Sequence, residues 1–384
     1  MIELKNLYKS YRGKSVLMNI SLTIQDNEFF VLIGSSGCGK TTLLKTLNKL
    51  NPIDKGEILI NGTPINRIKV TQLPRLMGYV VQEGGLFPHM TVEDNIALAM
   101  RVAGYPKEKI YDRITELLEL VNLEPDQYRS QYPSQLSGGQ RQRIGVARAF
   151  AADPEIILMD EPFSALDPMT RAELQDEVHR LQLRFHKTIV FVTHDMHEAV
   201  KLADRICILQ NGHVVQCDKP ENILKHPANE YINSFIGKNR LWENPSFIRA
   251  EDIMRPRPIT ISQSRTVVQA VQLMRHYNID SLLVTGDDNK FAGMVWLQDL
   301  IGIDQYSSPV SSFLSDDYLS VRVDDSLSTV LEKVADYGEK DFGILPVLDA
   351  EGAIRGFLNR SSLLSTLSRR FIDEPVERDE QEGA

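Results

Sequence analysis

A glycine-rich octapeptide, Gly34–Thr41 (GSSGCGKT), constrains the fold of this chain more than any other stretch. It follows an apolar run, FFVLI, that predicts a buried strand, and it opens an amphipathic helix, TTLLKTLNKL. In this pattern the glycines let backbone N–H groups turn toward phosphate oxygens, and the helix N-terminus adds its positive dipole end. Lys40 would reach the β- and γ-phosphates and the Thr41 hydroxyl would coordinate Mg²⁺. We therefore predict a nucleotide site here, rather than an ordinary glycine-rich turn.

A second apolar strand, Ile156–Met159, ends in two carboxylates, Asp160 and Glu161. Beside a phosphate-binding loop, Asp160 would orient Mg²⁺ and Glu161 would polarise the attacking water. The alternative, that both acids cap the next helix, explains less well why they follow a buried strand. A third strand, KTIVFVTHD, ends in His194, and His197 follows at the expected start of a helix. These two histidines could form a metal pair, but no third ligand is near them in the sequence, so we do not expect one.

The pattern of segments predicts how the chain is divided. Strand-like and helix-like segments alternate over residues 1–237, which predicts an α/β domain with a largely parallel sheet. The polar stretch 238–250 predicts a linker. Residues 251–306 and 311–368 align with each other, and each predicts a short β-α-β-β-α repeat. The acidic tail, residues 369–384, has little to bury and is expected to be disordered.

Composition excludes some classes of function. The chain has 384 residues and a net charge of −9, which argues against a nucleic-acid partner because phosphate binding needs clustered Lys and Arg. Its three cysteines are far apart and lack CxxC spacing, so they suggest neither a disulfide framework nor a zinc site, which fits the cytosol. The first residues do not form a signal peptide, and no run of about 18 apolar residues predicts a membrane span.

The motifs of residues 1–237 together resemble the nucleotide-binding subunit of an ABC transporter. GSSGCGKT, Gln82, LSGGQ, IILMDE, SALD and His194 follow one another in that family's order. The resemblance implies a P-loop ABC ATPase domain, with a RecA-like core plus antiparallel β and helical subdomains, that uses ATP and Mg²⁺. It also explains LSGGQ, which precedes strongly helical sequence from Arg141 to Ala152. In this family LSGGQ completes the ATP site of a second copy, so the resemblance implies a homodimer.

The resemblance implies a role for each matching residue. The ATP-binding set would be Tyr11, Gly34, Ser35, Ser36, Gly37, Cys38, Gly39, Lys40, Thr41, Thr42, Gln82, Ser137, Gly138, Gly139, Gln140, Asp160 and Asp167. Thr41, Gln82 and Asp160 would hold Mg²⁺, while Glu161 and His194 would be catalytic.

The resemblance assigns more specific roles to four of these residues. Tyr11 would stack on adenine, with Tyr8 as the competing candidate. Gln82 would sense Mg²⁺ and the attacking water, and Asp167 would link the two sites across the dimer. Ser137 would offer its hydroxyl to the γ-phosphate of the second copy, together with N–H groups at a helix N-terminus.

Between Gln82 and LSGGQ the sequence GLFPHMTV places Leu86, Phe87 and Met90 on an expected exposed loop. Packing in the core is the general alternative for such residues. The resemblance implies instead that residues 82–96 contact a cytoplasmic helix of a permease, in the version typical of importers.

Residues 251–368 resemble a tandem pair of CBS (cystathionine-β-synthase-type) domains, beginning at EDIMRPRPITI. Members that bind adenosine use an Asp at a strand end to hold the ribose. Here Asp299 is in place, but Trp296 stands where Ser or Thr is usual, and the second repeat has Asn359 and Ser362 at these positions. Binding of AMP or ATP and a pure role in dimerisation therefore both stay open.

An ABC ATPase fused to CBS repeats resembles the ATPases of glycine betaine, carnitine and choline importers. It implies ATP-driven import of a quaternary ammonium compound, with a trimethylated relative such as ergothioneine not excluded. The chain would lie at the cytoplasmic face of a bacterial cell membrane, bound to a permease and served indirectly by an extracytoplasmic substrate-binding protein.

Regulation by cyclic di-AMP is a further hypothesis, with Asp299 and Arg360 as candidate residues. The alternatives are import of another small solute, with CBS domains that only dimerise or sense ionic strength. An ATPase of DNA repair or translation would need a coiled-coil insertion or a second ATPase domain, and neither is present. A module that no longer hydrolyses ATP would have lost Glu161 or His194, and both are here.

Overall fold

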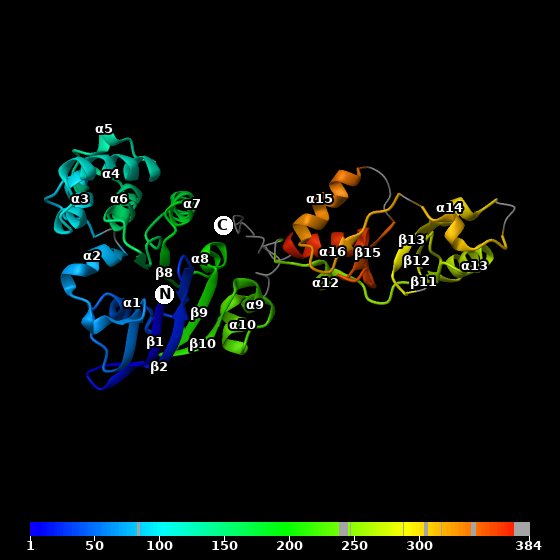
Figure 1. Cartoon of the computed structure of the whole chain (residues 1–384), viewed down its shortest axis with the longest axis horizontal. Helices are drawn as coiled ribbons and strands as arrows, with labels where there is room; N and C mark the ends of the chain where they lie inside the picture. Colours follow the sequence, from blue (N-terminus) through cyan, green and yellow to red (C-terminus); the bar gives the residue numbers. More distant parts are fainter. Residues whose placement is uncertain are drawn as a thin grey trace, which may run out of the picture. The chain divides into compact units, whose positions relative to one another are not determined.

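The computed structural model forms two compact units, Met1–Ile236 and Gly237–Ala384 (Figure 1). The residues that it describes are 1–82, 85–237, 245, 247–286, 288–302, 306–315, 317–338 and 343–371. In this part of the chain no helix is both long and apolar enough to span a membrane.

A six-stranded sheet in the order β10-β9-β3-β8-β7-β6 forms the centre of the first unit. Its strands are β3 (Phe29–Ile33), β6 (Met77–Val80), β7 (Ile156–Asp160), β8 (Thr188–Thr193), β9 (Arg205–Gln210) and β10 (His213–Asp218). Every pair is parallel except β9 with β10, so the largely parallel sheet predicted from the sequence is confirmed. Because parallel strands end at one edge, the residues after β3, β7 and β8 are brought together.

A second sheet in the first unit is antiparallel, in the order β2-β1-β4-β5. Its strands are β1 (Ile2–Tyr11), β2 (Lys14–Ile24), β4 (Lys55–Ile60) and β5 (Thr63–Pro64). Helix α1 (Lys40–Leu47) shares one buried cluster with both sheets, in which Leu43 and Leu44 meet Ile20, Ile58 and Val190. This apolar contact fixes the helix that starts at the phosphate-binding loop.

The remaining helices of the first unit fall into two groups. Helices α3 (Val92–Val102), α4 (Lys107–Leu120), α5 (Pro125–Tyr128) and α6 (Gly138–Ala151) gather together, away from α1 (Figure 1). The others are α2 (Leu73–Leu76), α7 (Pro168–Phe185), α8 (Met196–Leu202), α9 (Pro220–Lys225) and α10 (Glu230–Ile236). The helix predicted from Arg141 begins earlier, at Gly138, because Ser137 and Gln140 bond reciprocally and cap it.

Two β-α-β-β-α repeats form the second unit, as predicted. The first has β11 (Thr260–Ser262), α13 (Val267–Tyr277), β12 (Ser281–Thr285), β13 (Phe291–Trp296) and α14 (Leu297–Leu300). The second has β14 (Val321–Arg322), α15 (Leu327–Tyr337), β15 (Ile344–Leu348), β16 (Ile354–Asn359) and α16 (Arg360–Phe371). Each three-stranded sheet has one parallel and one antiparallel pair, in the same order.

The segment before the first repeat packs in the second one. Ile248 and Ala250, at 1% and 0% exposure, join the buried cluster of Leu345 and Leu358 together with Ile253 of α12 (Ala250–Ile253). Ile248 and Ala250, which the sequence places in the linker, are therefore part of a core, because their apolar side chains are buried there. Residues 238–244 and 246 of the predicted linker and 372–384 of the predicted tail lie outside the described residues. Residues 369–371, which the sequence places in the tail, belong to helix α16.

Candidate functional site

The loop between β3 and α1 needs glycine at specific positions. Gly34, Gly37 and Gly39 have φ values of 157°, 78° and 109°. A Cβ at Gly34 would overlap the carbonyl oxygen of Leu209, and one at Gly39 would lie 2.9 Å from the carbonyl oxygen of Val16. The loop backbone is therefore pressed against β9 and β2, and its curvature is that of a phosphate-binding loop.

Lys40 is a buried cation inside this loop. Lys40 is 5% exposed, and its Nζ donates to the carbonyl oxygens of Gly34 at 2.8 Å and Ser35 at 3.3 Å. Both acceptors are neutral. Within the described part of the chain, the Lys40 ammonium group makes no ion pair with a carboxylate. A buried ammonium group without an anion is costly, so the site suits a negatively charged ligand such as a phosphate.

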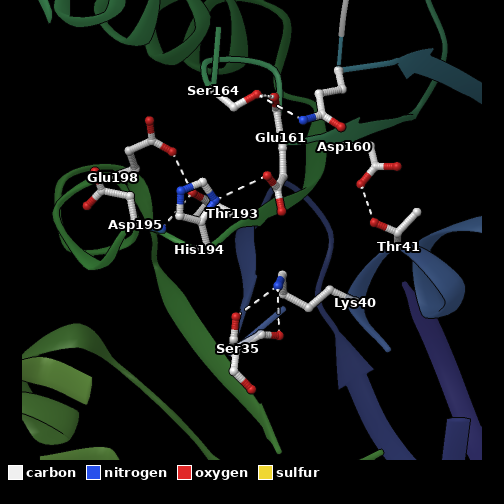
Figure 2. A network of polar contacts seen from close by, with 12 residues as sticks. Ser35, Lys40, Thr41, Asp160, Glu161, Ser164, Thr193, His194, Asp195 and Glu198 are labelled. Atoms are coloured by element: carbon white, nitrogen blue, oxygen red, sulfur yellow. Dashed lines mark hydrogen bonds and ion pairs between the residues drawn. The ribbon is translucent and has the colours of Figure 1, made fainter. Parts of the chain in front are cut away.

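Thr41 and Asp160 meet at the carboxyl edge of the sheet. The Thr41 hydroxyl donates to Asp160 Oδ1 at 2.7 Å, and Asp160 is 8% exposed at the end of β7 (Figure 2). Tyr79 donates to Asp160 Oδ2 at 3.4 Å, and burial with the nearby Asp160 charge raises the pKa of this phenol, which keeps it protonated as a donor. A hydroxyl and a carboxylate in contact are the hard oxygen ligands that Mg²⁺ prefers, so the two predicted ligands fit.

Glu161 has an unusual backbone and a partner on β8. Its φ is +45°, which is uncommon for a residue other than glycine, and its N–H donates to the carbonyl oxygen of Val192 at 3.0 Å. Glu161 Oε2 lies 3.1 Å from Nδ1 of His194, whose side chain is 62% exposed (Figure 2). Strained backbone of this kind concentrates at active sites. The two residues predicted to be catalytic are thus in direct contact.

Gln82 joins the site through a serine that sequence reasoning did not select. Gln82 Nε2 donates to Ser164 Oγ at 3.3 Å, and Ser164 Oγ donates to the carbonyl oxygen of Glu161 at 3.0 Å. The loops after β6 and β7 are therefore connected beside the two carboxylates. The structure describes no contact of Gln82 with Thr41 or Asp160, so its role as an Mg²⁺ ligand stays a prediction.

The LSGGQ segment lies elsewhere in the first unit. Helix α6, which Ser137 caps, packs against α3, α4 and β6, whereas α1 packs against β2, β7 and β8. A Cβ at Gly138 would meet only Arg141 Nη2 at 4.0 Å, whereas one at Gly139 would lie 2.7 Å from Thr170 Cγ2. The segment thus takes no part in the polar network around its own phosphate-binding loop, and Gly138 has open space beside it.

The two candidates for adenine stacking are both exposed, Tyr8 at 38% and Tyr11 at 44%. The Lys9 ammonium group lies 5.1 Å from the centre of the Tyr11 ring. No described contact joins either tyrosine to the phosphate-binding loop, and both candidates remain. A third tyrosine, missed by sequence reasoning, does contact it: the Tyr231 hydroxyl accepts from the Ser35 N–H at 3.3 Å, across 196 positions of sequence.

The remaining predicted residues occupy helix ends. Asp167 caps α7 and accepts from the Thr170 N–H at 3.0 Å. Hydrogen bonding by the Thr170 side chain and then by its N–H lowers the pKa of the Asp167 carboxyl. His194 precedes α8 instead of starting it, because Asp195 is the cap and accepts from the His197 N–H at 2.7 Å. The two histidines are therefore not on one helical face. Among the described residues no group of three possible metal ligands occurs.

The regulatory candidates of the second unit are both exposed. Asp299 lines a cavity of about 480 Å³ with Asp280 and Asp317, and Arg360 is the first residue of α16. The residues that replace the ribose-binding pattern in the second repeat bond each other. The Ser362 N–H donates to Asn359 Oδ1 at 2.8 Å, and the Asn359 N–H donates to Ser362 Oγ at 3.0 Å. They form a helix cap there.

A parallel sheet with a glycine loop, a buried lysine and two carboxylates at one edge defines a P-loop ATPase, here of the ABC class. The comparisons agree: residues 17–164 match the family described as ABC transporter, and residues 250–304 and 310–369 match the CBS domain. The chain belongs to the family of ABC transporter ATP-binding subunits that carry a pair of CBS domains.

Named relatives cover nearly the whole chain. It is 44% identical to the choline transport ATP-binding protein OpuBA of Bacillus subtilis, over 95% of each chain. It is 36% identical to the osmoprotectant import ATP-binding protein OsmV of Salmonella typhimurium, over 96% of each. The solved dimeric structure of MJ0796, a bacterial ABC transporter cassette, covers 57% of this chain and 99% of its own, with a TM-score of 0.53 and 34% identity.

Proposed function

We propose that this chain hydrolyses ATP to power an importer of quaternary ammonium compounds of the glycine betaine, carnitine and choline type. The names of its relatives support this cargo class, among them a second Bacillus subtilis protein, glycine betaine/carnitine/choline transport ATP-binding protein OpuCA, at 44% identity. The observation that carries hydrolysis is the contact of Glu161 with His194 beside the Thr41–Asp160 pair.

In this proposal the chain's own groups divide the work of hydrolysis. The loop N–H groups and the buried Lys40 ammonium bind the β- and γ-phosphates and stabilise the charge that develops on them. Glu161 accepts the proton of the attacking water, and His194, bonded to Glu161, contacts the γ-phosphate and orients that carboxylate. Thr41 and Asp160 would hold Mg²⁺, with Gln82 as a further ligand, and the ion would neutralise phosphate charge.

Substitution of Glu161 tests this assignment. We expect purified full-length Glu161→Gln to bind ATP as tightly as the wild type while phosphate release falls by about 10²–10⁴-fold, because general-base catalysis is lost. The variant should also accumulate as an ATP-bound dimer, measured by light scattering. Turnover close to that of the wild type would exclude Glu161 from this role.

We place the permease contact in an apolar groove beside β6, α2 and α3. The groove has a volume of about 530 Å³, and its lining includes Leu50, Val70, Phe87 and Val102, all more than 40% exposed. Phe87 belongs to the 82–96 segment, so its exposure supports a docking role over core packing. An amphipathic helix of the permease suits such a groove, and it would hold the chain at the cytoplasmic face of the cell membrane.

A charge in the groove tests this contact. Phe87→Asp should leave basal ATP hydrolysis intact and abolish its stimulation by the permease in proteoliposomes. The matched control is Leu183→Asp, an apolar residue that is 56% exposed on α7 outside the groove. Equal stimulation of both variants would contradict docking at the groove.

Measurement of solute uptake identifies which compound the importer carries. Proteoliposomes that contain this chain with the permease and binding protein encoded by neighbouring reading frames should take up labelled choline, glycine betaine or carnitine in an ATP-dependent manner. Ergothioneine belongs in the same panel because it is also trimethylated. Uptake of none of these would favour another small solute.

For regulation we propose that cyclic di-AMP binds the CBS repeats of two subunits. Arg255 and Arg257 support this, since they line a cavity of about 270 Å³ whose apolar walls include Ile344 and Phe357 and could take a base with its phosphate nearby. The acids beside Asp299 disfavour phosphate in the neighbouring cavity, and Arg360 lines neither of the two.

Calorimetry with the full chain separates the hypotheses. Binding heat that is lost in Arg255→Ala/Arg257→Ala supports the nucleotide. No heat, together with transport that still follows salt concentration, would favour ionic-strength sensing, because salt screens charges beyond about 8–10 Å. No heat and no salt response would leave dimerisation as the role of the repeats.

A further inference from the structure

Glu198 is a buried carboxylate behind the candidate site that the proposed hydrolysis does not use. It lies in the first turn of α8 and is 6% exposed. One of its oxygens accepts from the Thr193 hydroxyl at 2.6 Å (Figure 2). The other accepts a long bond, 3.5 Å, from the Gln175 amide of α7. Glu198 therefore joins the end of β8 to a neighbouring helix.

The Thr193 hydroxyl fixes the backbone on both sides of His194. It donates to Glu198, and it accepts from the N–H of Asp195 at 3.0 Å. His194 itself is largely exposed, and its ring has one described polar contact, the 3.1 Å contact with Glu161. The direction of the imidazole thus depends on the turn that carries it, and this turn is anchored at Glu198.

Helix α7 carries a second group toward Glu198. Arg171, one turn before Gln175, donates from Nη2 to the carbonyl oxygen of Leu166 at 2.9 Å. Its Nε is buried and has no hydrogen-bond partner among the described residues. A polar cavity of about 40 Å³ lies between Arg171, Glu198 and Glu161, large enough for a water molecule. Arg171, which bonds to the loop that ends at Asp167, therefore lines the same cavity as Glu198.

A carboxylate in this position is costly. Burial raises the pKa of Glu198, and the charge of Asp195 raises it further. The Thr193 hydrogen bond and the charges of Arg171 and His194 lower this pKa but do not cancel the effect of burial. Apolar residues of similar size in such a place are often as stable or more stable. Buried acids with a shifted pKa occur at functional sites and also in structural ion pairs. Glu198 differs from a structural acid in its position, because its hydrogen bond to Thr193 holds the turn that carries His194.

We propose that Glu198 is a positioning residue, which holds the Thr193–His194–Asp195 turn so that His194 faces Glu161 and the γ-phosphate, and which links this turn to α7. The proposal rests on the roles assigned above to Glu161 and His194. The described hydrogen bonds of Glu198 are to Thr193 and Gln175, on the far side of the turn from Glu161, so its effect should pass through His194.

Steady-state ATP hydrolysis by the full chain tests the proposal. We expect Glu198→Leu to lower kcat by about 10- to 100-fold with KM for ATP within about threefold, because the lost interaction acts in the transition state and the phosphate-binding loop is intact. Glu198→Gln should recover most of kcat, since its amide oxygen can still accept from Thr193. In a His194→Ala background, Glu198→Leu should cause no further loss, as coupled residues are not additive.

Glu177→Leu is the matched control. Glu177 is another buried acid, on α7, and burial raises its pKa. It forms an ion pair with Arg143 at 2.9 Å and accepts a hydrogen bond from Asn122 at 2.6 Å. The Glu177→Leu variant should have a lower thermal midpoint of unfolding, but the same kcat as the wild type at a temperature well below that midpoint. If Glu198→Leu does not fold, Thr193→Val replaces it in every comparison, because it removes the same hydrogen bond.

Three results would overturn the proposal: kcat of Glu198→Leu within twofold of the wild type, an equal loss with and without His194, or an equal loss in the Glu177 control. These are distinct from failure of the proposed function. An active Glu161→Gln would remove the site assignment itself, whereas an inactive Glu161→Gln beside a fully active Glu198→Leu would remove the positioning role alone.

Discussion

Two glycines of the phosphate-binding loop have very different surroundings. A Cβ at Gly34 would overlap the Leu209 carbonyl oxygen and lie 2.8 Å from the Cys38 Sγ, whereas at Gly37 no atom lies within 4 Å. Gly37 nevertheless has a φ of 78°, which side chains other than glycine rarely adopt. Packing therefore requires glycine at position 34, and backbone conformation alone favours it at position 37.

This difference predicts unequal effects of one added methyl group. Gly37→Ala should lower the free energy of unfolding by about 1–2 kcal/mol and keep ATP binding, because the strain is confined to the backbone. Gly34→Ala should cost more and abolish binding, because the loop must move away from β9. Denaturant unfolding and titration with a fluorescent nucleotide measure both quantities, and equal losses in the two variants would contradict the explanation.

The pKa of Glu177 predicts a dependence of stability on pH. Burial raises this pKa above the ordinary 4.5, against the opposing effects of Arg143 and Asn122. The folded chain therefore binds the proton more tightly than the unfolded chain, so this carboxyl makes the free energy of unfolding fall as pH rises from 4.5 through the folded pKa. Glu177→Gln should remove this fall. Urea unfolding between pH 4.5 and 8 checks it, and parallel curves for both proteins would show that the carboxyl does not titrate as described.

At the scale of residues, the sequence predicts those that follow buried strands, such as Lys40, Asp160 and His194, because strand ends of a parallel sheet meet. It does not single out Glu198, since an acid in the first turn of a helix is common for its interaction with the helix dipole. Its burial decides its meaning, and burial depends on α7, which comes from a separate segment. The sequence does not identify Tyr231 as a neighbour of the phosphate-binding loop for the same reason, because Tyr231 is far in sequence from Ser35.

Helix α6 shows how an element can differ from its local propensity. Glycine is a poor helix former, so the sequence places the start after LSGGQ. The reciprocal bonds of Ser137 and Gln140, at 2.9 and 3.2 Å, instead start the helix at Gly138. The N–H groups of its first turn thus belong to the motif itself, which is the arrangement that an anion of a second copy would require.

Gly138 predicts a separation of binding from dimerisation. Because the space beside it is open, Gly138→Ala and Gly138→Asp should both fold and bind ATP through the intact loop. If this helix start meets the γ-phosphate of a partner, Asp should abolish ATP-dependent dimerisation through like-charge repulsion while Ala reduces it far less. Light scattering of both variants in the Glu161→Gln background is the measurement, and undiminished dimers with Asp would contradict a composite site.

At the scale of the whole molecule, the second unit begins inside the stretch that composition assigns to a linker. Ile248 belongs to the predicted linker 238–250, yet it is 1% exposed in the core of the second repeat. Composition could not show this because the partners of Ile248, such as Leu345 and Leu358, lie about a hundred residues later in the sequence, in the second repeat.

Ile248→Ala tests this assignment. The variant should lower the free energy of unfolding of the second unit by about 2–5 kcal/mol, as for other buried aliphatic truncations. The ATPase unit has its own core, so its basal hydrolysis should be unchanged. Calorimetric unfolding of the full chain would reveal a shift in one transition, and a shift in neither would place Ile248 outside the core.

The segment before the first repeat, residues 248–254, determines which part of the second unit would bear a mechanical force. The chain enters this unit in the second repeat, crosses to the first, and returns to the second for β14 to α16. Both ends of the described unit are therefore anchored in the same repeat, and the first repeat is topologically an insertion within it. A pull between these ends would load the second repeat alone, and the first would stay shielded from force until α12 detached.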